Sequence, residues 1–80
     1  MPKVRTGPIF SVKNEKDLGK ILQQRRKDLG ITQKELADLC ALSHNGISRI
    51  ELGDSSIRLS TLIKLSRFLG YTIKLEMEEI

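Results

Sequence analysis

Four polar side chains within six residues form the group best suited to recognise another molecule: His44, Asn45, Ser48 and Arg49. Ile47 and Ile50 lie three residues apart and would share the inner face of a helix, which turns these polar side chains outward. Asparagine pairs with adenine and arginine with guanine through two hydrogen bonds each, while serine and histidine can contact base edges or phosphates. Side chains of this kind near the start of a helix are typical of helices that enter the major groove of DNA.

Two short helices joined by a tight turn are predicted to carry this group. Thr32 begins a capping box, in which its hydroxyl accepts from the Glu35 backbone N–H and the Glu35 carboxylate accepts from that of Thr32. Apolar residues follow at helical spacing: Leu36, Leu39 and Cys40. Ser43 then offers a second N-cap hydroxyl, and the small Ala37 lies where the two helices must cross. The segment 33–52 therefore reads as a helix-turn-helix, which favours sequence-directed DNA binding.

Two further helices complete a mainly α fold. Asn14 can cap the first, whose buried stripe is predicted to contain Leu18, Ile21, Leu22 and Leu29. The last should span about 59–69 and bury Leu59, Leu62, Ile63, Leu65 or Ser66, and Leu69. Gly30, Gly53 and Gly70 suit the ends of three helices, because glycine accepts a left-handed backbone cheaply. We expect an N-terminal arm (1–13), a DNA-binding domain (14–70) and a C-terminal tail (71–80).

The tail has a different period from the helices. Its apolar residues alternate with polar ones, which predicts a half-buried β-strand for dimerisation: Tyr71, Ile73, Leu75 and Met77. A lone strand is unstable, so it must pair with another edge. Pairing with residues 9–12 of the same molecule is one option, and pairing with its symmetry mate in a homodimer is the favoured one. Such a dimer would present two recognition helices to an inverted repeat of double-stranded DNA.

Charge and composition narrow the functional classes. Residues 1–34 hold nine Lys or Arg against three acids (+6), and residues 35–80 hold five against seven (−2), which gives the net charge of +4. This excess is weak support for a polyanionic ligand. No stretch reaches the roughly 18 apolar residues of a membrane span, and the N-terminus lacks the apolar core of a secretory signal, so we expect no membrane association and a cytoplasmic protein.

Enzymatic and metal chemistry have few candidate residues in this chain. One Cys and one His cannot supply the usual four ligands of a structural zinc site, so no metal or cofactor is expected. Cys40 falls among apolar positions and is predicted to be a buried packing thiol. A second histidine, a glycine-rich phosphate loop and paired carboxylates in a likely site are all missing, which argues against an enzyme.

The residues of the motif carry a family resemblance. Gln33, Ala37, Ile47 and Ile50, with RIELG at 49–53 and RRKDLGITQ at 25–33, resemble the Cro and lambda-repressor-like (XRE) family over residues 14–70. The resemblance implies a helix-turn-helix domain of four to five helices. The tail sequence LGYTIKLEME further resembles HipB-type antitoxins, in which a strand after the last helix builds the dimer and the partner is a HipA-like kinase toxin.

The resemblance also implies roles for individual residues. Gln33 would meet a phosphate and brace His44, Ser43 would contact a phosphate, and Arg26 and Glu51 would form a structural ion pair between the first and third helices. The implied DNA-binding set is Thr32, Gln33, Ser43, His44, Asn45, Ser48 and Arg49. Arg25 and Lys27 are either solvated or in contact with the DNA backbone.

Three positions depart from the family pattern. Ala41 stands where the turn usually has glycine, which implies either little left-handed character or some strain. Gly46 replaces a common hydroxyl residue, and Leu52 stands where a polar residue is usual, as an exposed contact for a partner. The functional expectation is a dimeric repressor that autoregulates its operon, either as the antitoxin of a HipBA-like system, acting partly or chiefly by protein binding, or as a stand-alone XRE regulator.

Overall fold

A computed structural model describes residues 7–54 and 56–79 of the chain. Its four helices are α1 (Glu15–Asp28), α2 (Gln33–Cys40), α3 (His44–Leu52) and α4 (Leu59–Leu69). The predicted mainly α fold is therefore confirmed, with helices at the positions that the capping signals indicate. None of the helices in these described ranges is both long and apolar enough to cross a membrane.

Side-chain caps fix where three of the helices begin. The Asn14 side chain accepts from the Asp17 N–H at 2.9 Å, and the Ser43 hydroxyl accepts from the Gly46 N–H at 2.9 Å. Thr32 and Glu35 form both hydrogen bonds of the predicted capping box, each 3.0 Å long. Each cap satisfies backbone donors that the first helical turn leaves without a partner. Local sequence thus sets the start of α1, α2 and α3.

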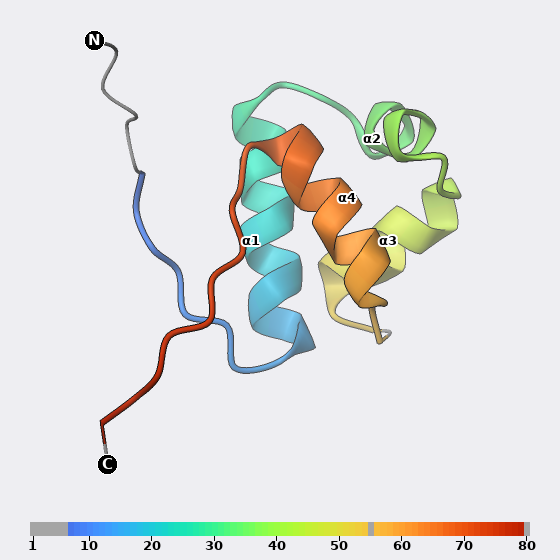
Figure 1. The fold of residues 1–80 in the computed structure, drawn as a ribbon. Helices are drawn as coiled ribbons and strands as arrows, with labels where there is room; N and C mark the ends of the chain where they lie inside the picture. Colours follow the sequence, from blue (N-terminus) through green and yellow to red (C-terminus); the bar gives the residue numbers. More distant parts are fainter. Residues whose placement is uncertain (1–6, 55, 80) are drawn as a thin grey trace, which may run out of the picture.

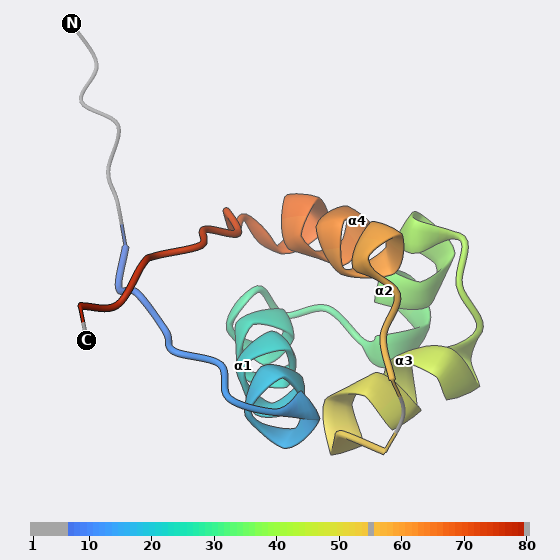
Figure 2. The ribbon, with the colours of Figure 1, turned by 60° about the horizontal axis from the view of Figure 1, so that its bottom comes forward.

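The four helices enclose one small core, and α3 lies against both α1 and α2 (Figures 1 and 2). The core residues come from all four helices: Leu22, Leu36, Ala37, Cys40, Ile47, Leu65 and Leu69. Ala37 and Cys40 are buried as predicted, with Cys40 only 1% exposed. Burial raises the pKa of the Cys40 thiol, an effect that the charge of Lys64 partly opposes.

Four apolar residues predicted to face inward are instead exposed: Leu29, Leu39, Leu59 and Ile63. Leu29 follows the last residue of α1, at its C-cap. The inward face of α2 consists of residues 36, 37 and 40, and that of α4 consists of residues 62, 65, 66 and 69. Leu39, Leu59 and Ile63 lie at the edge of these stripes of inward residues or outside them. With about 100° between successive residues, Ile63 lies about 60° from Ser66, at the edge of the α4 stripe. The apolar periodicity predicted the helices correctly but overestimated the width of their buried faces.

The turn between α2 and α3 is strained at one residue. Ala41 adopts a left-handed backbone with φ of 54° and ψ of 42°, a conformation that costs a non-glycine residue about 1–2 kcal/mol. The Leu42 N–H donates to the Ala37 carbonyl at 2.8 Å and closes the turn. The sequence left open whether this turn has little left-handed character or is strained at Ala41, and the structure shows the strained alternative.

The predicted C-terminal strand is not formed in the single chain. Among residues 7–54 and 56–79 there is no β-strand, and the tail crosses the N-terminal arm without a backbone ladder (Figures 1 and 2). The two segments touch through Phe10 and Tyr71, whose ring centroids lie 6.2 Å apart in an edge-on arrangement. Residues 1–6 of the arm and 80 of the tail lie outside the described residues. Because a strand needs a paired edge, pairing in a dimer stays a prediction.

Candidate nucleic-acid interface

The start of α3 presents a polar surface to solvent. His44, Asn45 and Arg49 are exposed and Ser48 is half-buried, whereas Ile47 is almost completely buried. Ser43 is also exposed, directly before the helix. Ile47 lies inward and His44, Asn45 and Arg49 lie outward, as the sequence predicted, whereas Ser48 and Ile50 are both half-buried. The surface offers both donors and acceptors of hydrogen bonds within the first two turns of one helix.

A chain of side-chain contacts connects this surface to the interior. The Gln33 Nε2 donates to Glu51 Oε1 at 2.9 Å, and the Gln33 Oε1 lies 3.1 Å from His44 Nε2. The Arg26 Nε donates to Glu51 Oε2 at 2.6 Å, and its Nη2 donates to Oε1 at 3.0 Å. The Arg26 Nη1 donates to the Ile31 carbonyl at 2.8 Å. Three helices are thereby tied together beneath the polar surface at the start of α3.

The contacts of Gln33 determine which ring nitrogen of His44 carries hydrogen. A carboxylate only accepts hydrogen bonds, so the amide NH₂ of Gln33 must face Glu51 and its oxygen must face His44. His44 Nε2 must then be the donor of the 3.1 Å contact. In the neutral ring this leaves Nδ1 as an acceptor.

The Arg26 and Glu51 side chains form a largely buried ion pair, 9% and 2% exposed. Removing one partner of such a pair strands the other charge in the interior, at a cost of about 3–5 kcal/mol. Together with the Gln33 and Ile31 contacts, the pair holds α1 and the loop after it against the end of α3. The pair therefore supports the position of α3 from within the fold.

Arg25 has a structural contact that the sequence analysis missed. Its Nε donates to the Leu69 carbonyl oxygen at 2.7 Å, at the C-terminal end of α4. A cation at this end of a helix satisfies an otherwise unpaired carbonyl and complements the helix dipole. The sequence analysis did not anticipate this contact, and contact of Arg25 or of the exposed Lys27 with the DNA backbone stays a prediction.

Gly19 is a second positioning residue that the sequence analysis did not identify. A Cβ atom at this position would lie 2.5 Å from the backbone carbonyl oxygens of both Ile50 and Glu51. The side chain must therefore be absent for α1 to approach the end of α3 so closely. A glycine inside a helix with good caps is the signal that could have indicated this close crossing.

A model of the family described as helix-turn-helix matches residues 22–75, which include the polar start of α3 and the buried contacts beneath it. The chain belongs to this helix-turn-helix family. The family is of the XRE type, as the resemblance of the motif residues indicated. The helix-turn-helix unit of this chain is formed by α2 and α3.

Two named relatives share this helix-turn-helix segment. An uncharacterised HTH-type transcriptional regulator of Haemophilus influenzae is 42% identical over 50 residues, which cover 62% of this chain and 51% of that protein. The HTH-type transcriptional regulator PuuR of Escherichia coli is 38% identical over 55 residues, which cover 69% of this chain and 30% of PuuR. The chain thus spans about half or less of the curated relatives it matches.

Solved helix-turn-helix structures share the fold over most of the chain. The restriction-modification controller protein C.AhdI of Aeromonas hydrophila aligns with a TM-score of 0.69 and 26% identity, covering 72% of this chain and 88% of its own. HipB in a complex with an O2 20mer aligns with a TM-score of 0.77 and 22% identity, covering 90% of this chain and all of its own. HipB also occurs in a solved complex with HipA. At this identity, the likeness to HipB establishes the fold alone.

Proposed function

We propose that this protein is a sequence-specific DNA-binding transcriptional repressor that acts as a homodimer on an inverted repeat. The observation that carries the proposal is the exposed polar start of α3, held in place from beneath by Gln33 and the Arg26–Glu51 pair. A recognition helix must present side chains to base edges without moving relative to the domain that grips the phosphates. The named relatives are transcriptional regulators, which supports this function.

The proposed contacts divide into base reading and phosphate binding. Asn45 and Arg49 read bases through paired hydrogen bonds, while His44 and Ser48 make further contacts in the groove. Thr32, Gln33 and Ser43 lie at the N-termini of α2 and α3, where helix dipoles and free N–H groups favour phosphate. The phosphate contacts position the dimer, and the base contacts specify the sequence.

Within this function we favour the antitoxin of a HipBA-like toxin-antitoxin system that autoregulates its operon. Support comes from the likeness to HipB along 90% of the chain and from exposed apolar residues that a partner could cover, including Leu52 at the end of α3. The alternative is a stand-alone XRE regulator without a toxin. The antitoxin role predicts a kinase-like protein that is encoded beside this gene and co-purifies with the chain. If neither the neighbouring gene nor the co-purifying protein is found, the stand-alone regulator is favoured.

DNA binding is tested by selecting sites from random duplexes and measuring affinity for the selected site and for an unrelated duplex at several salt concentrations. We expect an inverted repeat, with affinity that falls steeply as salt rises because phosphate contacts release counterions. Asn45→Ala should weaken specific binding by about 1–3 kcal/mol and leave binding to the unrelated duplex nearly unchanged. Gln24→Ala, which removes an exposed amide from α1, is the matched control. Equal losses of Asn45→Ala on both duplexes would reject the base contact.

A further inference from the structure

The two ring nitrogens of His44 differ in what they can bind. Nε2 lies 3.1 Å from the Gln33 side-chain oxygen and donates to it, because the Gln33 NH₂ group is turned toward Glu51. A neutral imidazole has a single N–H, so Nδ1 can only accept. Within residues 7–54 and 56–79, the Gln33 contact is the one hydrogen bond of this ring. His44 therefore offers an acceptor, and no donor, at the exposed start of α3.

Buried charges hold Gln33 in this orientation. The Glu51 carboxylate accepts from Arg26 at 2.6 and 3.0 Å, and the Glu51 side chain is 2% exposed. Turning the Gln33 amide round would bring its oxygen against this carboxylate and would lose a charge-assisted hydrogen bond. Gln33 is thus a positioning residue, since it decides which nitrogen of His44 is free to bind a ligand.

An acceptor distinguishes between the chemical groups that DNA presents. In the major groove the amino groups of adenine and cytosine donate, whereas guanine N7 and O6 and thymine O4 accept. Phosphate oxygens accept as well, so Nδ1 has no hydrogen to share with them. His44 in this state differs from Arg49, which only donates, and from Asn45, which does both. The group in the major groove that suits Nδ1 is therefore an exocyclic amino group.

We infer that His44 accepts a hydrogen bond through Nδ1 from the exocyclic amino group of an adenine or a cytosine in each half-site of the operator. The inference rests on the proposed DNA-binding function and specifies the chemistry that this residue reads. The amino group of a base pair lies on the side of its adenine or cytosine. An acceptor held in one place by Gln33 therefore selects which strand carries that base.

Site selection locates the base pair that His44 meets. Sites are selected from random duplexes by the parent and by His44→Ala at pH 8, where an ordinary imidazole is neutral. We expect the parent alone to prefer adenine or cytosine on one strand at one position of each half-site. If His44→Ala keeps every preference of the parent, the inference is overturned and the DNA-binding function is left intact. A parent that selects no site would refute the function itself, and the inference with it.

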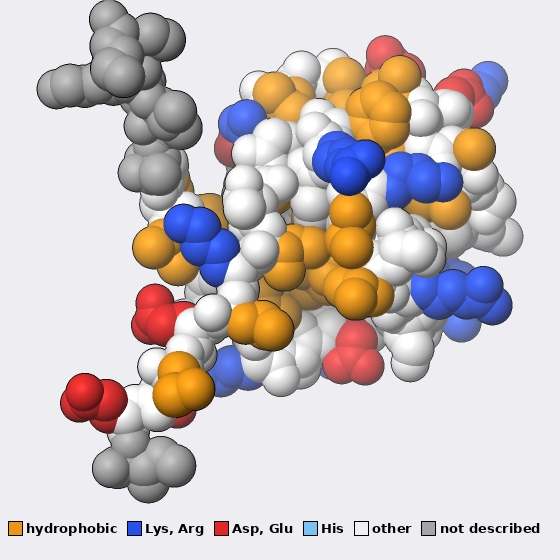
Figure 3. Space-filling model, viewed as in Figure 1, with side chains coloured by type: hydrophobic (Ala, Val, Ile, Leu, Met, Phe, Trp, Pro, Cys, Tyr) orange, Lys and Arg blue, Asp and Glu red, His pale blue; other side chains and the backbone are white. Residues whose placement is uncertain are grey.

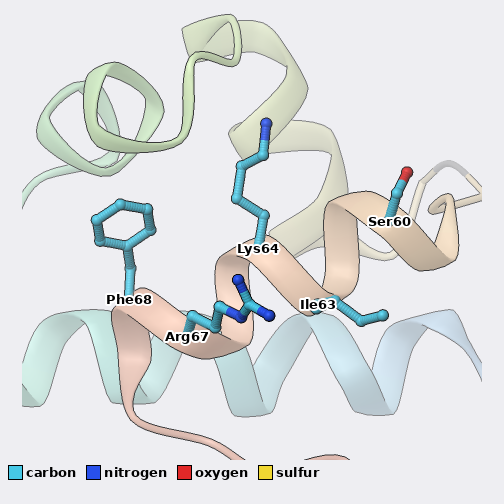
Figure 4. A pocket seen from close by; sticks show the side chains of 5 residues that line it. All are labelled: Ser60, Ile63, Lys64, Arg67 and Phe68. Atoms are coloured by element: carbon cyan, nitrogen blue, oxygen red, sulfur yellow. The ribbon is translucent and has the colours of Figure 1, made fainter.

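Phe68→Ala is the matched control, because it also removes an exposed ring. Phe68 is 47% exposed on the outer face of α4, which it shares with Ser60, Ile63, Lys64 and Arg67 (Figure 4). Figure 3 shows the region of α4, where hydrophobic side chains adjoin Lys and Arg side chains. This face lies outside the polar start of α3, so Phe68→Ala should select the same bases as the parent. The same lost preference in both variants would count against a direct contact of His44.

Removing the amino group tests the hydrogen bond itself. At the located base pair, 2-aminopurine replaces adenine, or 2-pyrimidinone replaces cytosine. Each analogue lacks the amino group in the major groove and keeps two hydrogen bonds to its partner base. The parent should bind the altered duplex about tenfold more weakly, and His44→Ala should bind both duplexes about equally. Equal losses for the two proteins would overturn the inference.

Gln33→Leu tests the positioning role of Gln33. Without the Gln33 oxygen, His44 can carry its hydrogen on Nδ1 and donate to guanine or thymine. The loss on the altered duplex should therefore shrink to about threefold or less, whatever the overall affinity of the variant. Gln24→Leu, the same change at an exposed position of α1, should keep the loss that the parent shows. An undiminished loss in Gln33→Leu would overturn the role of Gln33 in selecting the nitrogen.

Discussion

The Nε2 atom of His44 lies 3.1 Å from the side-chain oxygen of Gln33, and this contact connects the first residue of α3 to the buried Arg26–Glu51 pair. Because Gln33 turns its NH₂ group toward Glu51, only its oxygen is available to His44. A carboxylate in the interior thus orients the exposed His44 side chain through Gln33.

The neutral His44 ring should therefore carry its hydrogen on Nε2. Long-range ¹H–¹⁵N NMR reports the tautomer, and the signal is unambiguous because the chain has one histidine. Gln33→Leu removes the acceptor, so the two tautomers should become more evenly populated. A predominant Nδ1–H tautomer in the parent protein would contradict the proposed contact chain.

Arg26→Met should lower the free energy of unfolding by about 3–5 kcal/mol, because it leaves Glu51 charged, buried and without its ion-pair partner. Urea unfolding followed by circular dichroism measures the loss. Lys27→Met, the same type of change at the exposed neighbouring position, should change stability by less than about 0.5 kcal/mol. The double variant Arg26→Met with Glu51→Leu should regain part of the lost stability. If Arg26→Met and Lys27→Met lowered the free energy of unfolding equally, the ion pair would make no special contribution to stability.

Gly19→Ala should destabilise the fold by about 1–3 kcal/mol, because its Cβ meets the Ile50 and Glu51 carbonyl oxygens and forces α1 away from α3. Gly46→Ala is the comparison within α3, where the new Cβ meets only the Ser43 hydroxyl at 3.0 Å. That variant should stay within about 1 kcal/mol of the parent, since alanine also favours the helix. Thermal unfolding of the two variants side by side checks the difference, and the reverse ranking would argue against the close crossing.

Ala41→Gly should stabilise the protein by up to about 1 kcal/mol. Glycine adopts the left-handed backbone of this turn without strain, although it loses more entropy on folding. The expected result is a higher melting temperature with little change in DNA affinity. A lower melting temperature would mean that the methyl group of Ala41 contributes more than the strain costs.

The buried Cys40 thiol should make stability depend on pH in the alkaline range. Burial raises its pKa above the ordinary value of 9.0, so the folded state keeps its proton where the unfolded state loses it. This contribution to stability is complete below pH 9.0 and is lost as pH rises through the folded-state pKa. Urea unfolding between pH 8 and 10.5 should show a smaller decline for Cys40→Ala than for the parent, and identical slopes would exclude the effect.

Local sequence signals predicted the helices well, because a cap and a 3.6-residue period involve only neighbouring residues. Asn14, Thr32 and Ser43 each cap the helix that the sequence assigned to them. The contact of Arg25 with the Leu69 carbonyl could not be predicted in this way, since it joins residues 44 positions apart. The tail alternates as a strand should, but alternation does not supply a partner edge.

The sequence by itself determined four helices and the polar outward face of α3, because these follow from capping chemistry and from the spacing of Ile47 and Ile50. The tertiary structure decided how closely α1 approaches α3 at Gly19, which nitrogen of His44 donates to Gln33, and that Ile63 remains exposed. These features depend on contacts between helices, whose geometry is set only when the core residues pack together.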